Sequence, residues 1–142
     1  MISFVCGQLC SGKSLYARTL SRISDSKFIE VGDIVRKLKQ THERKELQDT
    51  KSLSSEIIEQ IKNEYKSNFN KQLVVSGVRQ VEILSAFPDA ILLWIECPKE
   101  EREKRYKKRA REGDTQTFEE AEAGDIKLGI LGVKKYIFDK KL

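Results

Sequence analysis

Eight consecutive residues near the start of the chain have the types and the spacing of a loop that holds phosphate groups. Residues 7–14 read Gly-Gln-Leu-Cys-Ser-Gly-Lys-Ser, which fits G-x-x-x-x-G-K-[ST] at every fixed position. Gly7 and Gly12 allow backbone angles that aim N–H groups at phosphate oxygens. In such a loop the amine of Lys13 reaches the β- and γ-phosphates, and the hydroxyl of Ser14 ligates Mg²⁺. The predicted chemistry is the binding of a nucleoside triphosphate with magnesium.

The predicted nucleotide-binding residues are the whole loop and the residue after it. They are Gly7, Gln8, Leu9, Cys10, Ser11, Gly12, Lys13, Ser14 and Leu15. Residues 2–6 predict a short buried strand before the loop, and residues 13–24 have the apolar spacing of a helix after it. The start of that helix adds the positive end of its dipole to the phosphate site. Because this is the context that the motif requires, a chance glycine turn is the weaker interpretation.

The rest of the chain alternates between predicted strands and helices. Further strands are predicted at residues 28–31, 73–75, 90–95 and 136–138. Further helices are predicted at residues 33–38 with Asp33 as cap, 53–69 with Ser54 or Ser55 as cap, 80–87, 98–111 and 118–123. This alternation is typical of a parallel sheet with helices on both faces. The predicted fold class is therefore α/β with three layers, as one domain over residues 1–142.

Charge is concentrated in one segment of the chain. The formal net charge is +5, and residues 99–112 carry eight basic and four acidic residues. A local basic helix suits a multiply anionic ligand, either small or polymeric. The longest apolar run, residues 90–95, is too short to span a bilayer, and no basic leader precedes the glycine loop. We expect a cytoplasmic protein that does not bind membranes.

The cysteines do not have the spacing of a disulfide framework or a zinc site. There are three of them with a single histidine, and none forms a C-x-x-C pair. Cys6 and Cys97 fall at predicted strand ends, where they are expected to fill the core. Cys10 lies inside the loop, where it is either a thiol activated by the helix start or, as we favour, a small side chain at a variable position.

Three later segments carry motifs of a known family. Residues 32–36 read Gly-Asp-Ile-Val-Arg, and residues 76–84 read Ser-Gly-Val-Arg-Gln-Val-Glu-Ile-Leu. They resemble the G-D-x-x-R step and the D-G-x-(P)-R…Q-x-E-x-L segment of the nucleoside monophosphate kinases, the family of adenylate kinase. Residues 95–98 (Ile-Glu-Cys-Pro) are similar to the stretch that leads into the lid. The missing proline and the run Arg-Ala-Arg-Glu-Gly-Asp at residues 109–114 resemble dephospho-coenzyme A kinase and the archaeal and phage nucleotide kinase-like proteins more closely.

The resemblance implies a P-loop NTPase fold of the nucleotide kinase type and gives roles to four arginines. Arg36 and Arg79 hold the phosphate of the acceptor, and Arg105 and Arg109 contact the adenine face and the triphosphate of the donor. Lys13, Arg79 and Arg109 thereby become candidate catalytic residues. Arginine suits these roles because it is permanently charged and binds phosphate through two parallel hydrogen bonds.

Each of these arginines also has an ordinary interpretation. Arg36 and Arg79 follow predicted strand ends, which places them at the same sheet edge as the loop, yet either can be a solvated helix charge. Arg105 and Arg109 lie in a helix rich in both charges, where a pair such as Glu101 with Arg105 is a common surface feature.

The chain departs from the family at several positions. Ser76 stands where the family usually has an acidic residue near Mg²⁺, so Ser14 and Asp33 are the residues expected to position the metal. Asp33 is a candidate acceptor contact and catalytic base, although a role as helix cap explains it equally well. The lid segment, residues 113–117, is brief, and eleven residues follow Leu131. We therefore expect a short lid and an adenine-side wall that is incomplete or supplied by a partner subunit.

The function expected from these features is direct phosphoryl transfer from ATP, with Mg²⁺, to a nucleoside monophosphate of the ribo or deoxy series. Residues 33–72 would form the acceptor-binding region and residues 99–117 the lid. The same fold acting on dephospho-coenzyme A, another small metabolite or a nucleic-acid hydroxyl is one alternative. A non-catalytic ATP-binding regulator is another. Nucleic acid is not the favoured partner, and the chain is expected to be a monomer or a homodimer.

Overall fold

The structure is a computed structural model that describes residues 1–41, 53–109 and 116–140. Strands and helices alternate along most of the chain, as the sequence predicts. The strands are β1 (Ile2–Gly7), β2 (Lys27–Glu30), β3 (Leu73–Ser76) and β4 (Ile91–Ile95). The helices are α1 (Lys13–Ile23), α2 (Val31–Thr41), α3 (Ser54–Ser67), α4 (Val81–Ser85), α5 (Lys99–Arg109), α6 (Phe118–Leu128) and α7 (Ile130–Lys140).

The four strands form one parallel sheet in the order β2-β3-β1-β4. The two central strands are almost wholly apolar because side chains on both of their faces are buried. In the register of the sheet, Glu30 lies opposite Ser76, and Gly7 lies opposite Ile95. Since all four strands run in the same direction, their carboxyl ends meet at one edge, where open α/β sheets bind ligands.

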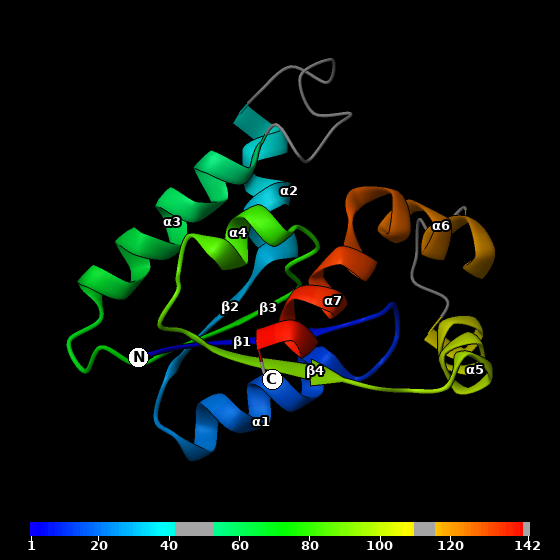
Figure 1. Cartoon of the computed structure of the whole chain (residues 1–142), viewed down its shortest axis with the longest axis horizontal. Coiled ribbons are helices and arrows are strands. Elements are labelled where there is room, and N and C mark those ends of the chain that lie inside the picture. Colours follow the sequence, from blue (N-terminus) through cyan, green and yellow to red (C-terminus); the bar gives the residue numbers. More distant parts are fainter. Residues whose placement is uncertain (42–52, 110–115, 141–142) are drawn as a thin grey trace.

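Helices cover both faces of the sheet, which gives the three predicted layers. Figure 1 shows α1 on one side and α3, α4 and α7 on the other. Neighbouring residues of β1 point to opposite faces, so Phe4 belongs to a larger core with Ile57 and Ile61 of α3, whereas Val5 belongs to a smaller core with Ala17 of α1. The fold class is therefore the predicted α/β arrangement.

The predicted strand at residues 136–138 is wrong, because these residues lie inside α7. The three bulky residues there look like a strand when taken alone. In the structure only Ile137 of the three is buried, together with Ile130 and Val133 at helical spacing, and Phe138 is 45% exposed. The segment forms a helix because the helical spacing of its apolar residues gives α7 a buried stripe that packs against β1 and β4.

Two predicted helix caps are also wrong. α2 begins at Val31, directly after β2, so Asp33 lies in the first turn of the helix rather than before it. α3 is preceded by Leu53 without a side-chain cap, and the hydroxyl of Ser54 donates instead to Oε1 of Gln80 (2.7 Å). The helix predicted at residues 118–123 exists but continues to Leu128.

Parts of two predicted regions, residues 42–52 of the acceptor side and residues 110–115 of the lid, lie outside the described residues. In the portions of the chain that the structure does describe, no helix has the length and hydropathy needed to cross a membrane.

Candidate functional site

The predicted phosphate loop joins the end of β1 to the start of α1, and backbone contacts give it its shape. A Cβ atom at Gly7 would lie 2.3 Å from Oγ of Ser11 and 3.0 Å from the carbonyl oxygen of Ile95, so only glycine fits there. The N–H of Ser11 donates to the carbonyl oxygen of Gln8 (3.0 Å) and closes the turn. Cys10 has a φ of 60°, in the left-handed region. Such turns direct successive N–H groups toward one side, which is the geometry of an anion site.

The loop also presents donors that have no partner in the described structure. Ser11 is 4% exposed, and its hydroxyl oxygen makes no hydrogen bond to any described residue. Gly12, which precedes α1, has no side chain to cap the N–H groups of the first helical turn. An unpaired buried hydroxyl costs about 1–3 kcal/mol, and a phosphate oxygen would satisfy both kinds of donor. The residues present therefore fit the phosphates of a nucleotide.

Three charged side chains from distant parts of the sequence act on the amine of Lys13. Burial lowers the pKa of Lys13 below the ordinary 10.5, and the nearby cation of Arg79 lowers it further. Asp125, Glu30 and Cys10 act in the opposite direction on this pKa. The site thus gathers two cations and two carboxylates from α1, the turn after β3, α6 and the end of β2.

Arg79 is held beside the loop by α6. Its Nε atom lies 3.2 Å from Oδ1 of Asp125, whose side chain is 12% exposed, while the arginine side chain is 44% exposed. The junction of α6 and α7 approaches closely, since a Cβ atom at Gly129 would lie 3.2 Å from the carbonyl oxygen of Arg79. The guanidinium group is therefore positioned by one carboxylate but still open to solvent.

Arg105 reaches the loop from α5. It donates a hydrogen bond to the carbonyl oxygen of Cys10 (3.3 Å), and it also pairs with Glu101 one turn earlier in the helix (3.4 Å). The structure therefore contains a contact for each of the two interpretations of Arg105. Its guanidinium group forms a surface ion pair, and it also lies against the phosphate loop.

A buried arginine on the same helix, Arg102, was not identified from the sequence. It is 3% exposed and donates to the carbonyl oxygens of Leu9 (3.3 Å) and Cys97 (3.2 Å). It also pairs with Glu122 of α6 (2.7 Å) and lies over the ring of Phe118 (5.6 Å). Nothing in the charged run of residues 99–112 distinguishes this arginine from its neighbours. Through it, α5 and α6 are tied to the backbone of the phosphate loop.

The remaining predicted residues lie in other surroundings. Arg36 pairs with Asp33 across one turn of α2, and both side chains are more than 60% exposed. Arg109, at the end of α5, lies over the ring of Tyr106 (5.3 Å). The side chain of Leu15 is 72% exposed, so only its backbone can contribute to a phosphate site. Arg79 and Arg105 thus lie by the loop with Lys13, whereas the contacts found for Arg36 and Arg109 are with Asp33 and Tyr106.

Glu30 and Asp125 are two further residues that were not identified from the sequence. Oε2 of Glu30 accepts hydrogen bonds from the hydroxyls of Ser14 (3.1 Å) and Ser76 (2.8 Å). Its position at the end of a predicted strand was the available signal, since strand ends meet beside the loop. Asp125 had no such signal, because it lies among other acidic residues in α6.

A groove runs along β2 from this carboxylate. Its volume is about 430 Å³, and it is lined by residues of β2, α2 and α3. These residues are Lys27, Phe28, Ile29, Glu30, Asp33, Ile34, Lys37, Leu38, Gln60 and Glu64. Because Glu30 both lines the groove and bonds to Ser14, the groove opens directly beside the phosphate loop. We call it the β2 groove.

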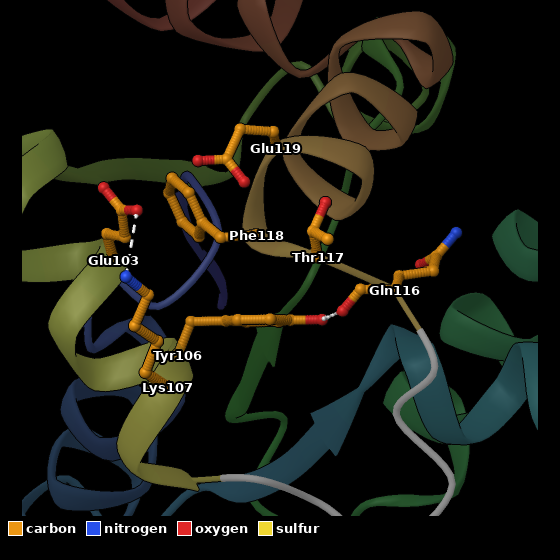
Figure 2. A pocket seen from close by; sticks show the side chains of 7 residues that line it. All are labelled: Glu103, Tyr106, Lys107, Gln116, Thr117, Phe118 and Glu119. Atoms are coloured by element: carbon orange, nitrogen blue, oxygen red, sulfur yellow. Dashed lines mark hydrogen bonds and ion pairs between the residues drawn. The ribbon is translucent and has the colours of Figure 1, made fainter.

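A second pocket, of about 390 Å³, lies between α5 and the start of α6 (Figure 2). Tyr106 crosses it and donates from its hydroxyl to the carbonyl oxygen of Gln116 (2.8 Å), and its ring meets Phe118 edge to face. Glu103 and Lys107 form an ion pair on its α5 side. The residues that line this pocket do not include Arg102 or Arg105, the two arginines of α5 that donate to carbonyl oxygens of the phosphate loop.

Within the described ranges, no three His, Cys, Asp or Glu side chains gather into a metal cluster. Mg²⁺ beside nucleotide phosphates does not need such a cluster, because it keeps several waters and takes few protein ligands. The hydroxyl of Ser14 with a carboxylate against it fits that requirement. Cys6 is fully buried, as expected of a core residue, and burial raises the pKa of its thiol to about 12.

A family model described as an AAA domain, AAA_18, matches residues 4–127, which include the phosphate loop and every residue described above as surrounding it. Among solved structures, an uncharacterized protein from Eubacterium ventriosum ATCC 27560 is similar, with 21% sequence identity and a TM-score of 0.53. The similarity covers 77% of this chain and 61% of that one, and at this identity it shows the fold alone. The comparison with curated proteins yields no match.

Proposed function

This chain belongs to the AAA_18 family of AAA domains and is a P-loop nucleotide-binding domain, and on that premise we propose that it is an ATP- and Mg²⁺-dependent phosphotransferase. The proposed acceptor is a nucleoside monophosphate of the ribo or deoxy series. In the transfer, an acceptor phosphate oxygen forms a bond to the γ-phosphorus of ATP while the bond to the β–γ bridging oxygen breaks. ADP leaves with the electron pair of that bond, so no separate base is needed for an ionised acceptor.

One arrangement supports this proposal: Arg79, held by Asp125 at 3.2 Å, is among the charged groups around Lys13 of the phosphate loop, and it also lowers the pKa of that lysine. Two cations that repel each other in the free protein are stabilised when a multiply charged phosphate group lies between them. Phosphoryl transfer relies mainly on such positioning and charge stabilisation, rather than on covalent chemistry by the protein. A loop that only held a nucleotide would not need a second cation from a different strand end at this point.

The proposed roles follow from the positions of the residues. The loop amides, the hydroxyl of Ser11 and the amine of Lys13 would hold the donor phosphates. Arg105 would stabilise the triphosphate from the α5 side, because it already lies against the loop. Arg79 would hold the acceptor phosphate next to Lys13. Arg109 would reach the donor only after leaving the ring of Tyr106.

Ser14 would hold the magnesium ion, which supplies charge neutralisation at the β- and γ-phosphates. The acceptor-binding region would comprise residues 33–72, with the β2 groove as its entrance, and residues 99–117 would form the lid of a single-domain enzyme. Asp33 lines the groove, and Arg36 is its ion-pair partner. Gln80, which is 3% exposed, has a side-chain N–H₂ group without a partner in the described structure, so it can donate to an acceptor.

A second candidate acceptor is a neutral hydroxyl group, as in a small metabolite or dephospho-coenzyme A. The β2 groove favours it, because its described lining carries three carboxylates against two lysines. A hydroxyl acceptor must lose a proton during transfer, and Asp33 is the carboxylate in the groove that would take it. An acidic groove repels a phosphate but tolerates an alcohol.

The experiment is acceptor-dependent ADP release from MgATP, measured across ribo- and deoxynucleoside monophosphates and dephospho-coenzyme A. Lys13→Ala serves as the control. We expect one acceptor to accelerate ADP release, with the increase absent in the control. Phosphorus NMR of the product then separates the two candidates, because transfer to a phosphate gives a diphosphate and transfer to a hydroxyl gives a phosphate ester. ATP binding without release for any acceptor would instead indicate a regulator.

A further inference from the structure

The carboxylate of Glu30 lies against Ser76, the residue at which this chain departs from the family that it resembles. β3 ends in Ser76, where the resembled family has an acidic residue near the metal. In this chain the Oγ of Ser76 donates to Oε2 of Glu30 (2.8 Å), and the Oγ of Ser14 donates to the same oxygen (3.1 Å). A single carboxylate oxygen therefore joins the hydroxyl that would bind Mg²⁺ to the end of the neighbouring strand.

The sheet brings Glu30 to this point. Glu30 and Ser76 are directly opposite in the parallel pairing of β2 with β3, and adjacent strands lie about 4.8 Å apart. A glutamate from β2 can span that distance and end where a shorter acidic side chain on β3 would place its oxygens. Ser76 itself is fully buried, so its hydroxyl can serve only a neighbour inside the protein.

Gly77 provides the room for this carboxylate. A Cβ atom at position 77 would lie 2.8 Å from Oε1 of Glu30, closer than real Cβ contacts occur. The residue also has a φ of +89°, which side chains rarely adopt. Both oxygens of the carboxylate thus have defined surroundings, Oε2 against two hydroxyls and Oε1 against the bare turn after β3.

We infer that Glu30 positions the magnesium ion through Ser14 and replaces, from one strand over, the acidic residue that position 76 lacks. When a lone pair of the Ser14 oxygen binds the metal, its hydrogen continues to donate to Glu30. A ligand held by such a carboxylate is oriented and more electron-rich, and the loss of partners of this kind costs 10–100-fold in metal affinity or activity. Glu30 is also a charge partner of Lys13, so its negative charge offsets the cations around the phosphates.

This inference rests on the proposed use of MgATP, and its test uses Mn²⁺ in place of Mg²⁺. Electron paramagnetic resonance measures the affinity of Mn²⁺ for the full chain with ATP bound. Glu30→Gln keeps an oxygen that accepts from both serines but removes the charge. We expect its Mn²⁺ affinity to fall about 10–100-fold while ATP binding without metal stays within about threefold of the unmodified protein.

Two further variants sharpen the test. Glu64→Gln removes a carboxylate that lines the same groove but pairs with Lys27, and it should leave Mn²⁺ affinity unchanged. The double variant Glu30→Gln with Ser76→Asp returns an acidic residue to β3, and it should recover most of the lost affinity. Recovery is an outcome that a merely structural role for Glu30 does not predict.

Unchanged Mn²⁺ affinity in Glu30→Gln, with ATP bound, would overturn the inference and leave the proposed function standing. An equal loss of metal-free ATP binding would overturn it as well, because Glu30 would then only hold the loop in shape. Failure of the proposed function itself is recognised separately, since the unmodified protein would then show no acceptor-dependent ADP release.

Discussion

The phosphate loop and the β2 groove lie side by side at one edge of the sheet, but they are built differently. The loop takes its shape from consecutive backbone groups, and Arg102 and Arg105 donate to two of its carbonyl oxygens. The groove takes its charge from side chains of three elements, and two of its three carboxylates are already in ion pairs. Lys27 pairs with Glu64 at one part of the groove, and Asp33 pairs with Arg36 at another.

Because they are built differently, the loop and the groove should respond differently to their ligands. The loop holds unpartnered donors in place before a nucleotide arrives, so donor binding requires little reorganisation. In the proposed reaction, an acceptor that enters the groove would displace ion pairs there, and Arg79 would give up its pairing with Asp125 to bind the acceptor phosphate. Donor affinity should therefore depend on the loop and on Arg105 beside it, whereas transfer should depend on side chains on both sides.

The largest expected effect is that of Lys13→Ala on the loop. Removal of the one amine among the loop donors should lower phosphoryl transfer about 10³-fold, since charge stabilisation at the transferring group is lost. It should also weaken ATP binding, measured by isothermal titration. Lys37→Ala removes a lysine that lines only the groove, so its ATP affinity should stay unchanged. A similar loss of ATP affinity in both variants would remove the distinction between the two halves.

The next largest effect concerns the support of the loop. Arg102→Met leaves Glu122 without its buried partner. Breaking such a pair should lower the free energy of unfolding by about 3 kcal/mol. Lys99, which lies 3.8 Å from Glu122, should offset part of this loss. Urea denaturation measures the free energy of unfolding. Lys107→Ala, which breaks an exposed pair on the same helix, should cost less than about 0.5 kcal/mol. Equal small costs would show that Arg102 does not anchor the loop.

The smallest expected effect is a shift in the pH dependence of ATP affinity, through the action of Arg79 on Lys13. Burial and Arg79 lower the pKa of Lys13, so the amine loses its charge at a lower pH than an ordinary lysine. The affinity for ATP should therefore fall on the alkaline side, starting below pH 10.5. Arg79→Ala removes the repelling cation, raises the pKa of Lys13 and moves this fall to higher pH. Arg36→Ala should leave it in place, and an equal shift in both would contradict the arrangement around Lys13.

The parts of the fold that were predictable from sequence depend on short-range patterns. The phosphate loop occupies eight adjacent residues whose backbone requirements are local, and β1 and β4 are short apolar runs. The strand predicted at residues 136–138 was wrong because three bulky residues are compatible with both the strand period and the helix period. Only the longer spacing of Ile130, Val133 and Ile137 shows the helix.

The charged part of the site was harder to predict because it depends on pairing between distant residues. Glu30 meets Ser76 through strand register, and Asp125 meets Arg79 through the return of α6 to the sheet edge. The local spacing of residues predicts neither the register between strands nor the position of a helix against the sheet. Lys13 and Arg105 were identified because a motif or a resemblance pointed to them, whereas Arg102 had neither.

In the proposed reaction, Lys13 and Arg79 together stabilise a phosphoryl group that moves from a bound donor to an acceptor. Single-turnover transfer from γ-labelled ATP to the acceptor, measured beside the dissociation constant of ATP, tests it in Arg79→Ala. We expect transfer to fall about 100-fold while ATP binding weakens less than about threefold. Equal losses in transfer and in ATP binding would contradict it, because Arg79 would then serve only the donor.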